Sequence, residues 1–339
     1  MFTATKDGFS ALKVWRAVAA TAVICLLAGA GYNYLAGQIL RRRHPVPGNF
    51  YVVEGIPMHI HCVGSGSPPV ILESGLGDDW MVWQKVQPDL SKVTRVCSYD
   101  RSGLGWSGAR GGSRNALKIA EQLRDLLRTA SIFGPFVVAG HSAGGLYARA
   151  FATRYPSDVA ALVLVDASNP DAFRDSLKIE RSRVRSARHD QAPWLWFRTA
   201  FGFRRLANDC AGKRYRGLDA LADQAKAAAC RPEFVNSWLG EWDEFESSAE
   251  ELDALKCCGS VPLLILSQDP RKGDFDPLWH AAQERLEQLS SRSRRIVAQD
   301  SGHYVMIDRP DLVIEQISKL LHDLRAGVLS SDDEPTSER

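Results

Sequence analysis

A strand pattern that ends in a glycine-flanked serine constrains this chain more than any other feature. Residues 136–144 read Phe-Val-Val-Ala-Gly-His-Ser-Ala-Gly, and helix-forming sequence follows over residues 145–154. A strand that turns sharply into a helix leaves no room beside the turning residue, so glycine is required at Gly140 and Gly144. The helix N-terminus also offers unpaired N–H groups to a developing negative charge. The stretch therefore predicts a strand–turn–helix unit with a nucleophilic serine, Ser142, at the turn.

Strand and helix signals alternate on both sides of this unit, which is typical of a mostly parallel sheet with helices on both faces. Residues 167–259 interrupt the alternation, because they are helix-rich, carry many Arg and Trp residues, and are inserted between two strands. We expect them to form a cap over the site. The prediction is one α/β domain over residues 50–325 with a cap at about 167–259, followed by a polar, disordered tail at 326–339. Further strands are expected at 50–54, 57–63, 69–73, 94–99, 160–165, 261–267 and 295–298, and helices at 115–130, 278–289 and 311–324.

An uncharged apolar segment over residues 17–40 follows the N-terminal residues 1–16 and precedes a linker at 41–49. Its length is sufficient to span a bilayer once. The small residues Ala28-Gly29-Ala30 could serve as a signal-peptide cleavage site, but the apolar run continues past them to a basic stop. We therefore favour an uncleaved, single-pass transmembrane anchor. Basic residues flank the segment on both sides, so charge alone does not orient it.

The overall composition does not indicate a partner that binds through bulk charge. The chain has 339 residues, 24% of them charged, a formal net charge of +2 and no long basic run, which argues against nucleic acid as a partner. No C-x-x-C pair suggests zinc or thiol redox chemistry, and we expect neither a metal nor a cofactor. Cys210 and Cys230 could form a disulfide in an exported domain, and this pairing favours the outer, periplasmic or extracellular side of the membrane. The alternative is that the cysteines are small buried apolar residues.

Four motifs in chain order resemble the serine-hydrolase branch of the α/β-hydrolase fold family, over about residues 50–324. Gly140-His141-Ser142-Ala143-Gly144 resembles the nucleophile elbow, and Ser74-Gly75-Leu76-Gly77 resembles the oxyanion loop after the third strand. Residues 100–107 resemble the loop after the fourth strand, where we expect Asp100 to hold Arg101 and the loop glycines. Gly302-His303 with Pro310 resembles the histidine loop before the last helix. The resemblance implies the α/β-hydrolase fold with a helical cap.

The chemistry assigns a role to each of these motifs. A serine hydroxyl needs a base to remove its proton, and His303 is the candidate base. The acid that orients His303 has two candidates in the order Ser, Asp, His. Asp269 follows the strand after the cap, the usual family position, although its surroundings depart from the common Gly-x-x-Asp pattern. Asp166 ends the strand after the elbow helix, a position that some related dehalogenases use; Asp274 and Asp276 are weaker candidates.

The oxyanion hole of this fold is built from main-chain donors. We expect it to consist of the backbone N–H groups of Leu76 and Ala143, because the residue after the nucleophile and one residue of the third-strand loop supply it.

These expectations describe a membrane-anchored hydrolase that cleaves a carboxylic ester or related acyl bond through an acyl-enzyme on Ser142. The substrate would be a small, hydrophobic acyl compound. A serine argues against epoxide hydrolase or dehalogenase chemistry, which this fold performs with an aspartate. Peptidase, C–C bond hydrolase and acyltransferase activities remain open within the enzymes. Outside them, the alternative is a non-catalytic protein that binds a small ligand.

The predicted cap combines basic and aromatic residues. We favour an arrangement in which the aromatic side chains line or cover the substrate pocket while the arginines form a solvated face. The alternative places this surface on lipid headgroups. The aromatic residues are Trp194, Trp196, Phe197, Phe201 and Phe203, and the basic residues are Arg174, Lys178, Arg181, Arg183, Arg185, Arg188, Arg198, Arg204 and Arg205.

Overall fold

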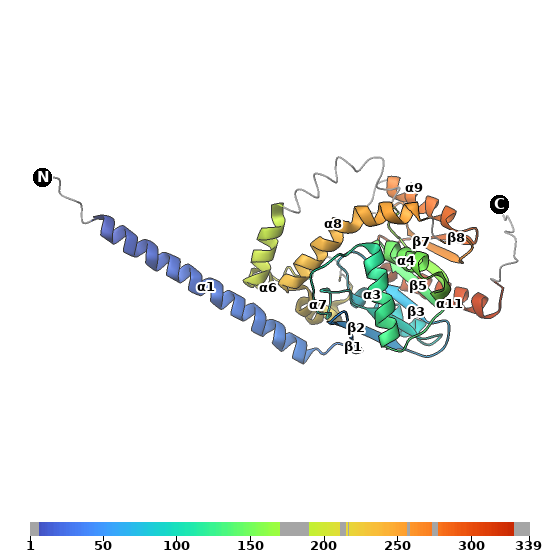
Figure 1. Ribbon diagram of the computed structural model, residues 1–339, viewed down its shortest axis with the longest axis horizontal. Helices are drawn as coiled ribbons and strands as arrows, with labels where there is room; N and C mark the ends of the chain where they lie inside the picture. The colour runs from blue at the N-terminus through green and yellow to red at the C-terminus, as the bar shows by residue number, and fades with distance from the viewer. Residues whose placement is uncertain are drawn as a thin grey trace.

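The structure is a computed structural model that describes residues 7–169, 190–210, 215, 217–255, 258–272 and 277–328. The basic residues predicted for the cap between 174 and 188, the acid candidates Asp274 and Asp276, and most of the predicted tail lie outside these residues. Figure 1 shows the long helix α1 (Asp7–Arg43) extending from a compact body of strands and helices.

The body is built on an eight-stranded sheet in the order β1-β2-β4-β3-β5-β6-β7-β8. Strand β2 pairs antiparallel with both β1 and β4, and all pairings from β4 to β8 are parallel. The predicted α/β fold class with a mostly parallel sheet is therefore confirmed. The strands are β1 (Asn49–Val53), β2 (Ile56–Val63), β3 (Val70–Glu73), β4 (Val96–Tyr99), β5 (Phe136–His141), β6 (Val159–Val165), β7 (Leu263–Gln268) and β8 (Ser293–Ala298).

Alternate side chains of the central strands enter two different helical layers. Val138 of β5 packs toward α3 (Ala116–Thr129) and α4 (Ala143–Arg154). Its neighbours Val137 and Ala139 pack on the opposite face. Burial on both faces explains why these strands read as continuous apolar runs. The opposite layer contains η1 (Trp80–Trp83), α2 (Gln87–Leu90), α10 (Val305–Asp308) and α11 (Pro310–Arg325).

Shorter elements complete the body between these layers. The 3₁₀ helix η2 (Pro156–Asp158) leads into β6, while α9 (Pro277–Arg285) and η6 (Leu286–Leu289) connect β7 to β8.

The described residues between β6 and β7 contain helices and no strand, and we use the word cap for this insertion. Residues 190–200 are helical. The other elements of this insertion are α6 (Phe203–Leu206), η5 (Asp219–Leu221), α7 (Ala222–Ala229) and α8 (Pro232–Ala254). Helix α8 packs on α3 and α4, and α7 packs on α1. The insertion therefore bridges the α/β body and the N-terminal helix.

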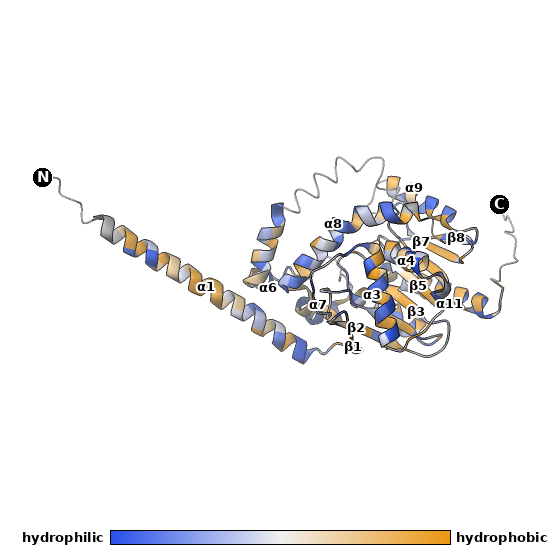
Figure 2. Ribbon diagram, in the orientation of Figure 1, coloured by the Kyte–Doolittle hydropathy of each residue, from blue (hydrophilic) through white to orange (hydrophobic). Residues whose placement is uncertain are grey.

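Helix α1 is apolar along most of its length, as the orange colouring in Figure 2 shows. From Ala11 to Arg43 it is long and apolar enough to cross a membrane, by length and composition. A single helix of this kind near an N-terminus fits either a membrane span or a signal sequence.

Two disulfides join described cysteines. One is the anticipated pair Cys210–Cys230, and the other is Cys62–Cys97, which the sequence did not indicate. Cys62 and Cys97 lie directly opposite each other on β2 and β4, so their pairing depends on strand register. Disulfides are typical of proteins that fold in oxidising compartments.

We expect the Cys62–Cys97 bond to stabilise the antiparallel part of the sheet by restricting the unfolded chain. Its sequence separation is 35, for which the loop-closure relation gives about 4 kcal/mol. The double variant Cys62→Ala/Cys97→Ala should therefore unfold at a clearly lower urea concentration than the wild type, as followed by circular dichroism. Cys25→Ser is the control, because Cys25 is a free, exposed cysteine. Equal midpoints for all three proteins would contradict the prediction.

Candidate active site

Ser142 lies at the junction of β5 and α4 in a backbone conformation that is rare for a residue with a side chain. Its φ is 53° and its ψ is −123°. This left-handed region is sterically costly, and the surrounding packing must hold it. A side chain at Gly140 would overlap the backbone of Gly144, and a Cβ at Gly144 would lie 2.5 Å from the carbonyl oxygen of Glu73. The predicted strand–turn–helix unit is thus present, and its glycines are required by close backbone contacts.

The structure brings together His303 and one of the two candidate acids. The Nδ1 atom of His303 donates to Oδ2 of Asp166 at 2.6 Å. Asp166 is fully buried, whereas the imidazole of His303 keeps 16% of its surface exposed. A buried carboxylate on Nδ1 fixes the tautomer of a histidine and leaves its Nε2 available to accept a proton.

Two neighbours hold Asp166 in this orientation. The indole Nε1 of Trp279 donates to both carboxylate oxygens at 3.2 Å, and the backbone N–H of Gln268 donates to Oδ1 at 3.1 Å. The Trp279 ring also meets the His303 ring edge-on, with 5.6 Å between centroids. Trp279 therefore contacts both members of the pair. The sequence contained no signal for this role, because Trp279 belongs to α9, more than a hundred residues after Asp166.

His141 connects the histidine loop to the turn at Ser142. Its Nε2 donates to the carbonyl oxygen of His303 at 3.0 Å, and the two rings lie 4.6 Å apart between centroids. Burial lowers the pKa of His141 well below its usual value, so the ring is neutral. His141 thus packs beside the serine and fixes the position of the His303 backbone.

Asp269, the other candidate acid, has different partners. Its carboxylate accepts hydrogen bonds from the side chain of Arg271, at 2.8 and 3.0 Å, and from the backbone of Asp300 at 3.0 Å. The hydrogen bonds from Arg271 lower the pKa of Asp269 far below its usual value. These contacts make Asp269 a strongly ionised residue that stabilises the two loops after β7 and β8.

The loop of residues 74–77 lies directly against the serine. A Cβ built on Gly75 would be 3.3 Å from the Cβ of Ser142 and 3.0 Å from Nδ1 of His141. Leu76 follows in this loop and is partly exposed, and Ala143 begins α4, where the first N–H groups have no acceptor within the helix. The two expected main-chain donors therefore lie on segments that both adjoin Ser142.

A buried guanidinium holds this loop in place. Arg101 donates to the carbonyl oxygens of Ser74 at 2.7 Å and Gly75 at 2.6 Å. It also forms ion pairs with Glu73 at 2.6 Å and with Glu241 of α8 at 2.7 Å. Burial raises the pKa of Glu73 to about 7.

Glu241 also binds the loop directly. Its second oxygen accepts the backbone N–H of Gly77 at 2.9 Å, so that the cap helix and the loop are bonded to each other. The sequence did not indicate Glu241, because its two partners, Gly77 and Arg101, lie far from it along the chain.

The expected role of Asp100 requires correction. Asp100 does not pair with Arg101; it accepts from the backbone N–H groups of Trp80 and Trp106, both at 2.9 Å, and from Nδ1 of His59 at 2.8 Å. A Cβ at Gly105 would overlap its carboxylate. Asp100 therefore does hold the loop after β4, while Arg101 turns toward the two buried glutamates.

The chain is similar to proteins that share this architecture. A family model described as alpha/beta hydrolase fold matches residues 68–310. A Pseudomonas putida protein, 2-hydroxy-6-oxo-2,4-heptadienoate hydrolase, is 27% identical over 277 residues, which cover 77% of this chain and 91% of that protein. An uncharacterised Schizosaccharomyces pombe protein is 25% identical over 239 residues, or 70% of this chain, and the match spans 43% of its length.

A solved structure shows the same arrangement of elements. The malate-bound structure of a thermophilic esterase from Thermogutta terrifontis is 26% identical, with a TM-score of 0.58. The match covers 82% of this chain and 98% of the esterase.

We expect Glu241→Gln to destabilise the protein, because the buried Arg101 charge would lose one of its two carboxylate partners. Removing one partner of a buried ion pair costs about 3 kcal/mol or more in free energy of unfolding. Glu244→Gln is the matched control, since Glu244 lies one turn further along α8 and accepts from Ser113 and from the backbone of Arg114. The Glu244→Gln substitution should lower the free energy of unfolding by less than about 1 kcal/mol. Similar urea midpoints for the two variants would contradict this account of the loop.

Proposed function

Because this chain belongs to the α/β-hydrolase fold family, we propose that it is a serine hydrolase that cleaves a carboxylic ester or related acyl bond through an acyl-enzyme on Ser142. The observation that carries the proposal is the 2.6 Å hydrogen bond from His303 to the buried Asp166, on loops adjacent to the strained turn at Ser142. Asp166 is the acid in this proposal. Asp269 is assigned a structural role, because its carboxylate is bonded to Arg271.

In the proposed reaction, the Oγ atom of Ser142 attacks the acyl carbonyl carbon while Nε2 of His303 accepts its proton. Asp166 stabilises the resulting imidazolium. The backbone N–H groups of Leu76 and Ala143 would donate to the oxyanion, a contribution of about 3 kcal/mol per donor in comparable sites. His303 then protonates the leaving alcohol, and a water molecule that His303 deprotonates releases the acid from Ser142.

A C–C bond hydrolase is the second candidate. It is favoured by the 27% identity to the Pseudomonas putida 2-hydroxy-6-oxo-2,4-heptadienoate hydrolase along most of both chains. The same serine, histidine and aspartate would serve either bond.

Purified protein should therefore be assayed with p-nitrophenyl esters of increasing chain length and, separately, with 2-hydroxy-6-oxo-2,4-heptadienoate. Turnover of the latter alone would favour the second candidate, and the preferred ester length would define the acyl pocket.

We also propose that α1 is an uncleaved anchor and that the catalytic domain lies on the outer side of the membrane. The anchor is supported by the length and hydropathy of α1. The orientation is supported by the disulfides Cys62–Cys97 and Cys210–Cys230, which an oxidising compartment favours.

The nucleophile can be tested without knowing the substrate. A fluorophosphonate probe should label the wild-type protein, because it reacts with an activated serine, and the label should disappear in Ser142→Ala. Ser102→Ala, on the loop after β4, is the control and should label normally. A wild-type protein that is folded and fails to label would instead favour a non-catalytic ligand-binding protein.

The two aspartates can be separated with matched variants. We expect Asp166→Asn to lower kcat on the best ester about 10⁴-fold, because the amide would stabilise the wrong tautomer of His303. Asp269→Asn should retain most of the activity and lose stability instead. The measurement is kcat for both variants with circular dichroism as the check on folding. A larger loss of kcat in folded Asp269→Asn would overturn the assignment of Asp166.

A further inference from the structure

The C-terminal half of α1 is joined to the cap through one face. Its residues Leu26, Gly29, Asn33, Gly37 and Leu40 recur every three or four positions and are buried or partly buried, while Ala11 to Cys25 are exposed on all sides. A side chain at Gly29 would come within 2.5 Å of the carbonyl oxygen of Phe201, so the helix backbone touches the cap there. Small residues with this spacing allow such close approach between segments at a membrane. We call this face the docked face.

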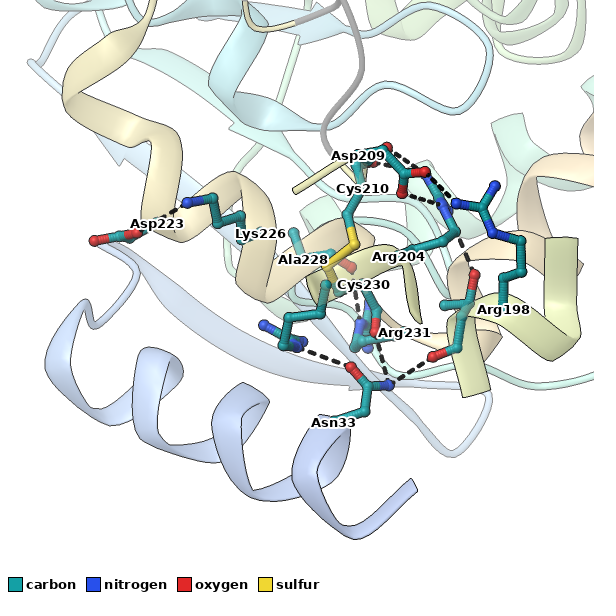
Figure 3. The surroundings of a disulfide bond; sticks show 12 residues. Asn33, Arg198, Arg204, Asp209, Cys210, Asp223, Lys226, Ala228, Cys230 and Arg231 are labelled. Atoms are coloured by element: carbon teal, nitrogen blue, oxygen red, sulfur yellow. Dashed lines mark hydrogen bonds and ion pairs between the residues drawn. A yellow bond between two sulfur atoms is a disulfide. The ribbon is translucent and has the colours of Figure 1, made fainter. Parts of the chain in front are cut away.

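Asn33 is the polar centre of the docked face. Its amide nitrogen donates to the carbonyl oxygens of Thr199 at 2.8 Å and Cys230 at 3.2 Å, and its oxygen accepts from Nε of Arg205 at 2.8 Å. These partners come from three segments of the cap, which the Cys210–Cys230 disulfide holds together (Figure 3). A buried amide whose donors and acceptor are all used specifies one register of α1 against the cap.

Aromatic residues on α1 indicate the level of the membrane boundary. Trp15 is exposed near one end of the apolar segment, and Tyr32 and Tyr34 are exposed near the other. The helical rise places these residues about 26 to 29 Å apart, close to the roughly 30 Å of a bilayer hydrocarbon core. Such aromatic belts mark the two interfaces of a membrane-spanning segment. The boundary on the cap side is therefore at Tyr32 and Tyr34.

The cap exposes large apolar side chains at this same level. They are Trp194, 61% exposed, Trp196, 41%, Phe203, 44%, and Leu206, 66%, which we call the aromatic surface. The cap contacts α1 at Gly29 and at Gly37. Along the helix axis, Gly29 lies about 5 Å from Tyr32 toward the membrane, and Gly37 lies about 8 Å from Tyr32 in the opposite direction. Phe203 and Leu206 belong to the segment that makes these two contacts, through Phe201 and Arg205.

Large apolar side chains that are exposed next to one another are unfavourable in contact with water. Trp194 stacks on Phe197, and Phe197 stacks on Phe203, so Trp194 and Phe203 belong to one continuous cluster. Contiguous apolar surface of this kind marks an interaction site. Because the cluster adjoins the candidate membrane span, the bilayer is its occupant.

The neighbouring arginines have protein partners. Arg198 and Arg204 both pair with Asp209, at 2.8 and 3.1 Å, and Arg205 binds Asn33. The contact with lipid would then be apolar, without a requirement for anionic headgroups.

We infer that the aromatic surface is inserted at the headgroup–acyl boundary of the bilayer that α1 crosses, and that Asn33 holds it at this depth. The inference is independent of the serine chemistry. It differs from the expectation that these aromatic side chains cover the pocket beneath a solvated face, and takes up the alternative of a surface on lipid. It also requires that α1 is retained, since cleavage after Ala30 would remove Gly29 from the docked face.

The test uses the full chain in phosphatidylcholine vesicles, with an environment-sensitive NBD fluorophore on one cysteine. The native Cys25 reports whether α1 lies in lipid. In a Cys25→Ser background, Leu206→Cys and, separately, Trp194→Cys report on the aromatic surface, and Phe133→Cys, 68% exposed between α3 and β5, is the aqueous control. We expect blue-shifted emission and quenching by nitroxide lipids at positions 25, 206 and 194, unchanged by salt, and neither effect at 133.

Lipid exposure at position 25 combined with an aqueous signal at both 206 and 194 would overturn the insertion while leaving the anchor intact. An aqueous signal at position 25 would overturn the anchor and the insertion together.

The role of Asn33 is tested in the Leu206→Cys protein. Asn33→Leu should lower the quenching several-fold, because the apolar helix remains and its bonds to the cap are lost. Gln38→Leu, an exposed amide on the same helix, should leave the quenching unchanged; equal quenching in both variants would refute the role of Asn33.

Discussion

The buried guanidinium of Arg101 is the interaction on which the arrangement of the site depends. It binds the carboxylates at the end of β3 and on α8, and it binds two carbonyl oxygens of the loop beside Ser142. Charge inside a protein is stable only when it is paired and hydrogen-bonded, so sheet, loop and cap helix must meet in one geometry. The cap is thereby built into the site as one of its structural supports.

Helix α8 extends this connection toward α1. It begins just after Cys230 and Arg231, where the cap contacts α1, and it carries Glu241 further along. Arg231 itself donates to the carbonyl oxygen of Gly105 at 2.7 Å, in the loop after β4. The segment that accepts a hydrogen bond from Asn33 is thus continuous with the segment that supports the loop beside Ser142. A bilayer that fixes the position of α1 would therefore also constrain the start of α8 and, through Glu241, the loop beside Ser142.

The fold, the family and the position of the serine follow from local sequence. Strand runs such as 136–141 are apolar because both faces of the central sheet are buried, and Gly140 is required by contact with the backbone of Gly144, four residues away. The predicted family and fold class are confirmed, and the prediction of an enzyme of the hydrolase class is confirmed at the level of the family. The predicted domain boundaries, the catalytic residues and the acyl-enzyme route remain predictions.

Other features were decided only by the tertiary structure. The sequence left Asp166 and Asp269 as alternatives, because both follow parallel strands that end at the same edge of the sheet. The preference for Asp166 comes from the direction of its side chain toward His303, together with the indole of Trp279. The Cys62–Cys97 pair depends on strand register, and the ion pairs of Arg101 depend on where α8 crosses the sheet. Local sequence determines which elements form and where a turn must contain glycine, whereas contacts between residues far apart in the chain exist only after those elements have packed.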